Sequence, residues 1–182
     1  MCDGLVELHT ERTLLRALTL SDAPEVRRLV GAREVAATTL TIPHPYTTSM
    51  AEAWIGSHAE RRERGEALHW AITRRDDGVL LGVVGLELEN GHQRGELGYW
   101  IGVPYWGQGY CTEAVRAVVA YAFGVLRLEK LVACHFAGNE ASGRVMRKLG
   151  MTQEGVLRQH VLKWGQRIDL VFYGLLRAEW PG

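Results

Sequence analysis

Short apolar segments in the middle of the chain are separated by turn sequences. Residues 67–73, 79–88 and 96–103 each have the length and apolar content of a strand. The first two are joined by Asp76-Asp77-Gly78, and the second and third by Asn90-Gly91. Both sequences are typical of hairpins, so the pattern predicts an antiparallel meander in the centre of a sheet.

Helical repeats of apolar residues and further strand-like segments flank this meander. Ser21-Asp22-Ala23-Pro24 is a start signal for a first helix, and Ser49 with Glu52 forms a capping-box pattern for a second helix over residues 51–64. The other expected elements are a strand or bent hairpin within residues 5–18, a helix ending near Gly124, a strand over residues 131–136, a helix between Asn139 and Gly150, and strands over residues 156–162 and 168–176.

The order of these elements predicts one α+β domain over residues 1–182, with a core at about residues 11–177, about seven strands and about four helices. A chain of 182 residues that is 47% hydrophobic and 23% charged fits one compact domain. The formal net charge is zero. No general electrostatic field therefore favours nucleic acid or an anionic membrane as a partner.

Cysteine and histidine spacing predicts no metal site. The three cysteines, Cys2, Cys111 and Cys134, form no C-x-x-C pair, and the seven histidines show no H-x-x-x-H or H-x-H spacing. The first twenty residues lack the apolar run of a signal peptide, and no segment reaches the roughly 20 apolar residues that span a bilayer. We expect a cytoplasmic protein without a disulfide, a metal or a membrane partner.

The loop around Gly107-Gln108-Gly109 lies between a predicted strand and a predicted helix. Two glycines within three residues ease the torsions of an amide nest, and the helix N-terminus adds its positive end, so such a loop can hold a phosphate. The alternative is a tight turn without a ligand.

Two common nucleotide motifs do not fit this loop. A P-loop requires Gly-Lys-Ser or Gly-Lys-Thr, which the chain lacks. A dinucleotide fingerprint requires a glycine at Thr112 and an acidic residue at the end of the next strand, whereas Glu129 precedes that strand.

A joint set of motifs resembles the GNAT superfamily of N-acetyltransferases, and within it the Rim-type enzymes that acetylate ribosomal proteins. The resemblance covers residues 11 to about 177, and its motifs occur in the family's order. They are Ile42-Pro43-His44-Pro45-Tyr46-Thr47, Glu96-Leu97-Gly98-Tyr99-Trp100-Ile101, Tyr105-Trp106-Gly107-Gln108-Gly109-Tyr110-Cys111-Thr112-Glu113-Ala114, Asn139-Glu140-Ala141-Ser142 and Arg147-Lys148-Leu149-Gly150-Met151.

The resemblance implies a splayed, mixed and mostly antiparallel sheet, with acetyl-coenzyme A as cosubstrate in the gap between the strand of Glu96 and that of Leu131. Trp106 stands where the family often has Arg or Gln, a feature of the Rim-type group, and Cys111 replaces a small residue. The cofactor-binding residues implied are Ile101, Gly102 and Val103 for the pantetheine arm, Trp106, Gly107, Gln108, Gly109, Tyr110, Cys111 and Thr112 for the pyrophosphate loop, and Asn139 with Ser142 beyond it.

Catalysis by direct transfer needs a proton acceptor and a donor for the thiolate. Glu96 is the expected base, although a surface carboxylate on a strand is the alternative. Ser142 is the expected donor; a capping role beside Asn139 is compatible with this, and Tyr173 is a second candidate. A covalent route through Cys111 is disfavoured because no histidine spacing supplies a partner base.

The acceptor is expected to be a primary amine, most of all the N-terminal α-amine of a protein such as a ribosomal protein. A small-molecule amine (antibiotic, polyamine or amino acid) and a non-catalytic coenzyme A sensor are the alternatives. Whether two copies form a homodimer stays open. The expected acceptor-binding residues are Pro43, His44, Tyr46, Trp54, Arg158 and Trp164.

Overall fold

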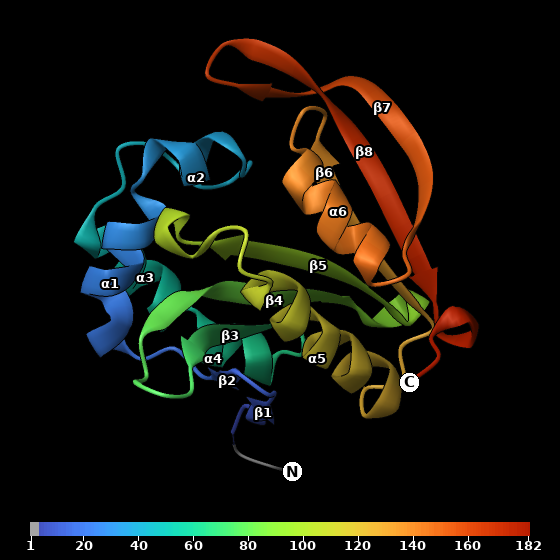
Figure 1. Ribbon diagram of the computed structural model, residues 1–182, viewed down its shortest axis with the longest axis horizontal. Coiled ribbons are helices and arrows are strands. Elements are labelled where there is room, and N and C mark those ends of the chain that lie inside the picture. The colour runs from blue at the N-terminus through green and yellow to red at the C-terminus, as the bar shows by residue number, and fades with distance from the viewer. Residues whose placement is uncertain (1–3) are drawn as a thin grey trace.

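The computed structural model describes residues 4–182, so Cys2 lies outside it. Its centre is an eight-stranded sheet in the order β1-β2-β3-β4-β5-β6-β8-β7 (Figure 1). All neighbouring strands are antiparallel except β5 and β6. The strands are β1 (Leu8–His9), β2 (Thr13–Arg16), β3 (Ala67–Arg74), β4 (Leu80–Glu89), β5 (Arg94–Ile101), β6 (Lys130–Phe136), β7 (Thr152–Lys163) and β8 (Gln166–Leu176).

The mixed, mostly antiparallel α+β architecture is confirmed, but the described residues form eight strands rather than about seven. The apolar segment near the start of the chain is two short paired strands, β1 and β2. The Asn90-Gly91 sequence is also not a two-residue hairpin. The connection runs over residues 90–93, and Gln93 takes the left-handed conformation at φ 48° that closes it.

Six α-helices lie within residues 4–182, two more than predicted. They are α1 (Ala23–Val30), α2 (Arg33–Ala37), α3 (Thr48–Gly56), α4 (His58–Glu63), α5 (Tyr110–Gly124) and α6 (Glu140–Lys148). The single helix expected over residues 51–64 is divided at Ser57 into α3 and α4, and at this residue the Ser57 hydroxyl donates to the Trp54 carbonyl at 2.7 Å. The cap of α3 is Thr47, which accepts from the Met50 amide, and not Ser49.

Helices cover both faces of the sheet and create two apolar cores. Helices α5 and α6 pack on one face (Figure 1), where Trp70 and Leu97 are buried. Helices α1, α2 and α3 pack on the other, where Ala71 is buried. Successive side chains of a strand point to opposite faces, so β3 supplies both cores. No helix of the described chain is long and apolar enough to cross a membrane.

Strands β5 and β6 separate part-way along their length. They are paired only from Arg94↔Lys130 to Glu96↔Val132. Beyond this point β5 stays paired with β4 as far as Ile101, while β6 follows β8 as far as Phe136. The sheet is therefore split into two limbs after Glu96, as the resemblance implied (Figure 1).

Candidate functional site

The glycine loop presents helix amides that no side chain caps. Gly107 and Gly109 have φ of 73° and 84°, a region that residues with a Cβ rarely adopt. Gly109 is the N-cap of α5 and has no side chain with which to cap it. The first amides of α5 are thus left for water or an anion, at the positive end of a fifteen-residue helix.

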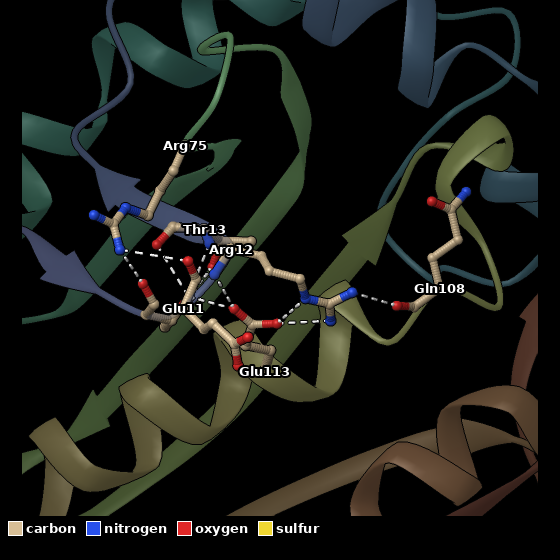
Figure 2. A network of polar contacts seen from close by, with 7 residues as sticks. Glu11, Arg12, Thr13, Arg75, Gln108 and Glu113 are labelled. Atoms are coloured by element: carbon tan, nitrogen blue, oxygen red, sulfur yellow. Dashed lines mark hydrogen bonds and ion pairs between the residues drawn. The ribbon is translucent and has the colours of Figure 1, made fainter.

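A cluster of polar contacts between Arg12, Glu113 and the Gln108 carbonyl, here called the Arg12 clamp, holds this loop (Figure 2). The Arg12 guanidinium donates to the Glu113 carboxylate at 2.7 Å and to the Gln108 carbonyl at 3.0 Å. It also lies 4.7 Å from the centre of the Tyr110 ring. Glu113 accepts further hydrogen bonds from Thr10 Oγ1, at 2.6 Å, and from the Arg12 amide. The turn between β1 and β2 thereby fixes the loop and the first turn of α5.

Burial and hydrogen bonding act in opposite directions on Glu113. Burial favours a raised pKa, but hydrogen bonds from Thr10 and Arg12 outweigh it and hold the pKa of this carboxyl below its usual value. The carboxylate therefore stays charged over the neutral range. No sequence motif indicates this clamp, because Arg12 and Glu113 lie 101 residues apart in the chain.

Ser142 lies in the first turn of α6. Asn139 caps α6 as predicted, since its Oδ1 accepts from the Ser142 amide at 3.3 Å. The Ser142 hydroxyl lies 3.0 Å from the Tyr99 hydroxyl of β5. The sequence motif that contains Tyr99 assigns this residue no role. In the structure its contact with Ser142 joins the two limbs of the sheet.

Glu96 lies where β5 and β6 part, on the other face of the sheet. Gly95 and Leu97 are buried beneath α5, whereas Glu96 and Gly98 are exposed. Partial burial of the carboxyl and then the charge of Glu89 raise the pKa of Glu96 above its ordinary value. Glu96 thus lies at the last β5–β6 pair, on the face of the sheet opposite Ser142.

Cys134 faces Glu96 from β6, with its Sγ 4.0 Å from the carboxylate. Burial and the charge of Glu96 raise the pKa of the Cys134 thiol to about 11. Burial raises the pKa of Cys111 to about 12, despite its place at a helix N-terminus. Both cysteines are free thiols that stay protonated at neutral pH, which argues against a covalent acetyl-enzyme on Cys111.

Residues 12–152 match the family model of the acetyltransferase (GNAT) domain. The chain belongs to the GNAT family of acetyltransferases. It is 33% identical to the uncharacterized N-acetyltransferase YoaA of Bacillus subtilis, over 94% of this chain and 97% of that protein. It is 27% identical to the [ribosomal protein uS5]-alanine N-acetyltransferase of Escherichia coli, over 72% of this chain and 69% of that enzyme.

Solved structures share the fold of this acetyltransferase. RimL, a ribosomal L7/L12 α-N-protein acetyltransferase in complex with coenzyme A, superposes with a TM-score of 0.87 at 19% identity, over 94% of this chain and 98% of that one. The family membership makes the protein an acyltransferase, with ribosomal-protein N-acetyltransferases among its relatives.

The backbone amides at the end of β5 point in two directions, so not all of those implied for the pantetheine arm can bind it. The Gly102 amide donates to the Leu81 carbonyl at 2.8 Å, so it faces β4. In an antiparallel ladder the peptide groups alternate in direction, so those of Tyr99 and Ile101 face the gap. The Ile101 carbonyl accepts from the Trp106 indole at 2.6 Å. The Gly102 amide is therefore already paired within the acetyltransferase, while the Ile101 amide is directed toward the gap.

The tip of the β7–β8 hairpin is attached to the segment between α2 and α3. Lys163, which is 7% exposed, donates from Nζ to the Leu40 and Ile42 carbonyls at 3.3 and 2.9 Å. The Trp164 ring lies 6.2 Å from the His44 ring. Two of the predicted acceptor residues are thus brought together, and Lys163, which no sequence motif marks, makes the connection.

The other predicted acceptor residues are more dispersed. Pro43 is exposed beside His44, and Tyr46 packs against the core of α1 and α3. Trp54 makes edge contacts with the stacked rings of His58 and His69. Arg158 is exposed in the bulge of β7 between Leu157 and Val161. The ring contacts of Trp54 with His58 and His69 support a packing role for Trp54 better than acceptor binding.

Proposed function

We propose that this acetyltransferase transfers the acetyl group of acetyl-coenzyme A directly to the N-terminal α-amino group of a protein. One observation carries the proposal: β5 and β6 part after the Glu96↔Val132 pair, with Glu96 on one face of the sheet and Ser142 on the other. A thioester held between the strands would expose its carbonyl carbon to an amine on the Glu96 side and its sulfur to Ser142.

The chain's own groups suit the parts of acetyl-coenzyme A. The uncapped amides at the start of α5 would donate hydrogen bonds to the pyrophosphate, and the Arg12 clamp keeps these amides in place. The Ile101 amide, which faces the gap, and the neighbouring Val103 amide would pair with the pantetheine arm. Bound in this way, acetyl-coenzyme A supplies an activated acetyl group and a thiol leaving group.

Glu96 and Ser142 would move the protons of the reaction. As the amine nitrogen bonds to the acetyl carbon, Glu96 takes a proton from it, directly or through one water. As the carbon–sulfur bond breaks, the Ser142 hydroxyl donates its proton to the sulfur and takes one from solvent in its place, and Glu96 later releases to solvent the proton that it took from the amine. An α-amine has a pKa of about 8 against about 10.4 for lysine, so a weak base suffices for the α-amine. The raised pKa of Glu96 brings its basicity closer to that task.

Gly98 leaves room for an acceptor beside Glu96. Gly98 lies opposite Gly85 on β4, and both glycines belong to the face of Glu96. A Cβ at Gly85 would meet the His69 ring at 2.9 Å, whereas a Cβ at Gly98 would meet nothing within 4 Å. A glycine inside a strand often marks a close approach by a ligand. The name of the E. coli relative, a uS5-alanine N-acetyltransferase, supports a protein N-terminus as that ligand.

Steady-state kinetics with acetyl-coenzyme A and peptides from ribosomal-protein N-termini test these roles. We expect Glu96→Gln and Ser142→Ala each to lower kcat by about 100-fold or more, while the dissociation constant of acetyl-coenzyme A changes by less than about threefold. Glu63→Gln, an exposed carboxylate on α4, is the matched control and should keep full activity. Full kcat in both site variants would contradict the assigned roles, and tight binding without turnover of any amine would favour a sensor.

A further inference from the structure

We propose that Tyr99 is a positioning residue that holds the Ser142 hydroxyl with its proton directed at the departing sulfur. The phenol oxygen lies 3.0 Å from Ser142 Oγ and 3.3 Å from the Ser142 carbonyl. The inference rests on the proposed role of Ser142 as proton donor. It assigns a function to a residue that the proposed mechanism does not otherwise use.

The direction of the hydrogen bond decides what Ser142 can do. A serine hydroxyl carries one proton and accepts through its lone pairs. If the Tyr99 hydroxyl donates to Ser142 Oγ, the serine proton remains available for the sulfur. Burial raises the pKa of Tyr99 far above its ordinary value, so the phenol keeps its one proton. That proton can go to the Ser142 carbonyl at 3.3 Å or to the nearer Ser142 Oγ at 3.0 Å, and the inference requires the second arrangement.

The backbone of Ser142 is fixed, so its side-chain torsion is the main freedom left. The Ser142 amide donates to the side chain and the carbonyl of Asn139, which sets the first turn of α6. A serine in a helix can turn its hydroxyl back onto a carbonyl of the preceding turn, and the proton is then lost to a donor role. The contact with Tyr99 holds Oγ away from that arrangement.

Tyr99 also lies at the place where the Ser142 hydroxyl has to be held. It belongs to the part of β5 that has left β6, three residues beyond the last pair at Glu96. Its ring packs against the core below α5, next to Cys111. The Cys111 thiol stays protonated, with a pKa of about 12, so no charged neighbour competes for the phenol proton. The Tyr99–Ser142 contact thus links the two limbs of the sheet beside the expected position of the sulfur.

A double-mutant cycle on kcat separates positioning from packing. Tyr99→Phe keeps the ring in the core and removes only the hydroxyl. We expect a loss of about 3- to 10-fold, the size of one hydrogen bond, and no further loss when Tyr99→Phe is added to Ser142→Ala. Tyr121→Phe, whose ring packs against Trp70, is the matched control and should keep full kcat.

Acetyl-seleno-coenzyme A supplies a readout that a packing defect does not change. A selenol is more acidic than a thiol and leaves as the anion without a proton donor. We expect the selenoester to restore most of the rate lost in Tyr99→Phe and in Ser142→Ala. Three results would overturn the inference: equal losses of kcat with the thioester and the selenoester, a loss that multiplies in the double variant, or full kcat in Tyr99→Phe. If Ser142→Ala is slow and is rescued but Tyr99→Phe is normal, only the Tyr99 inference fails; if Ser142→Ala is itself normal, the proposed donor fails.

Discussion

Glu87 of β4 lies directly opposite Glu96 of β5, so two carboxylates occupy one cross-strand pair. Like charges in such a pair destabilise a sheet, and Arg61 of α4 offsets one of them by a hydrogen bond of 3.2 Å to Glu87. Burial, the charge of Glu89 and then that of Glu87 raise the pKa of Glu96, while Arg94 lowers it. The protonation of the proposed base is therefore set by its neighbours.

The acidic limb of kcat, measured with the peptide amine saturating so that the pKa of the free amine (about 8) does not set it, should lie above pH 4.5, the ordinary pKa of a glutamate, because Glu96 must be ionised to accept a proton. Activity falls as pH falls through this raised pKa. Glu87→Gln removes a negative charge and should move the limb to lower pH. Arg61→Met leaves Glu87 uncompensated and should move it to higher pH. Shifts in the same direction, measured with saturating acetyl-coenzyme A, would contradict this electrostatic account.

Filling the space above Gly98 should affect the acceptor and not the donor. Gly98→Val adds a side chain into open space on the face of Glu96, and valine suits a strand, so the fold should be kept. We expect the KM for a peptide amine to rise about tenfold or more, and the dissociation constant of acetyl-coenzyme A to stay within about twofold. An acceptor KM equal to that of the wild type would place the acceptor elsewhere.

Loosening the Arg12–Glu113 clamp should weaken donor binding. Glu113→Gln removes the charge that holds Arg12, and Arg12→Met removes the hydrogen bond to the Gln108 carbonyl. Each variant should raise the dissociation constant of coenzyme A by about 3- to 30-fold in calorimetry, as expected for loss of a charge-assisted hydrogen bond. Arg64→Met, which removes pairs with Glu60 and Glu66 at the end of α4, is the control. Unchanged affinity would show that the loop does not need the clamp.

Releasing the β7–β8 hairpin should mobilise the proposed acceptor side. Lys163→Met keeps most of the apolar stem and removes both hydrogen bonds to the segment between α2 and α3. We expect faster amide hydrogen exchange over residues 38–47 and a severalfold higher acceptor KM, with the affinity for coenzyme A unchanged. Exchange rates like those of the wild type would mean that the contact at the tip carries no constraint.

Local signals in the sequence predicted the elements that lie next to each other in the chain. The meander follows from apolar runs and turn residues, and the start of α6 follows from Asn139 as its cap. The loop at Gly107 and Gly109 was predicted because unusual torsions select glycine. The division at Ser57 has no such signal, because the apolar pattern and the helical hydrogen bonds both continue through this residue.

Contacts between distant segments left no comparable signal. The contacts of Arg12 with Glu113 and of Lys163 with the Ile42 carbonyl join segments that only the fold brings together. The phenol of Tyr99 belonged to a recognised motif, but its partner depends on where β5 and β6 separate. Beyond that point β5 stays paired with β4 and β6 with β8, a divergence that periodicity along one strand does not reveal.

The most direct test of direct transfer to an α-amine uses two peptides of one sequence, one with a free N-terminus and a blocked lysine, the other with a blocked N-terminus and a free lysine. Each is incubated with the acetyltransferase and acetyl-coenzyme A, and peptide and enzyme masses are followed by rapid quench. The account predicts acetylation of the first peptide only, with no acetylated enzyme at any time. Acetylation of the lysine peptide alone, or an acetyl-enzyme that forms before product, would contradict it.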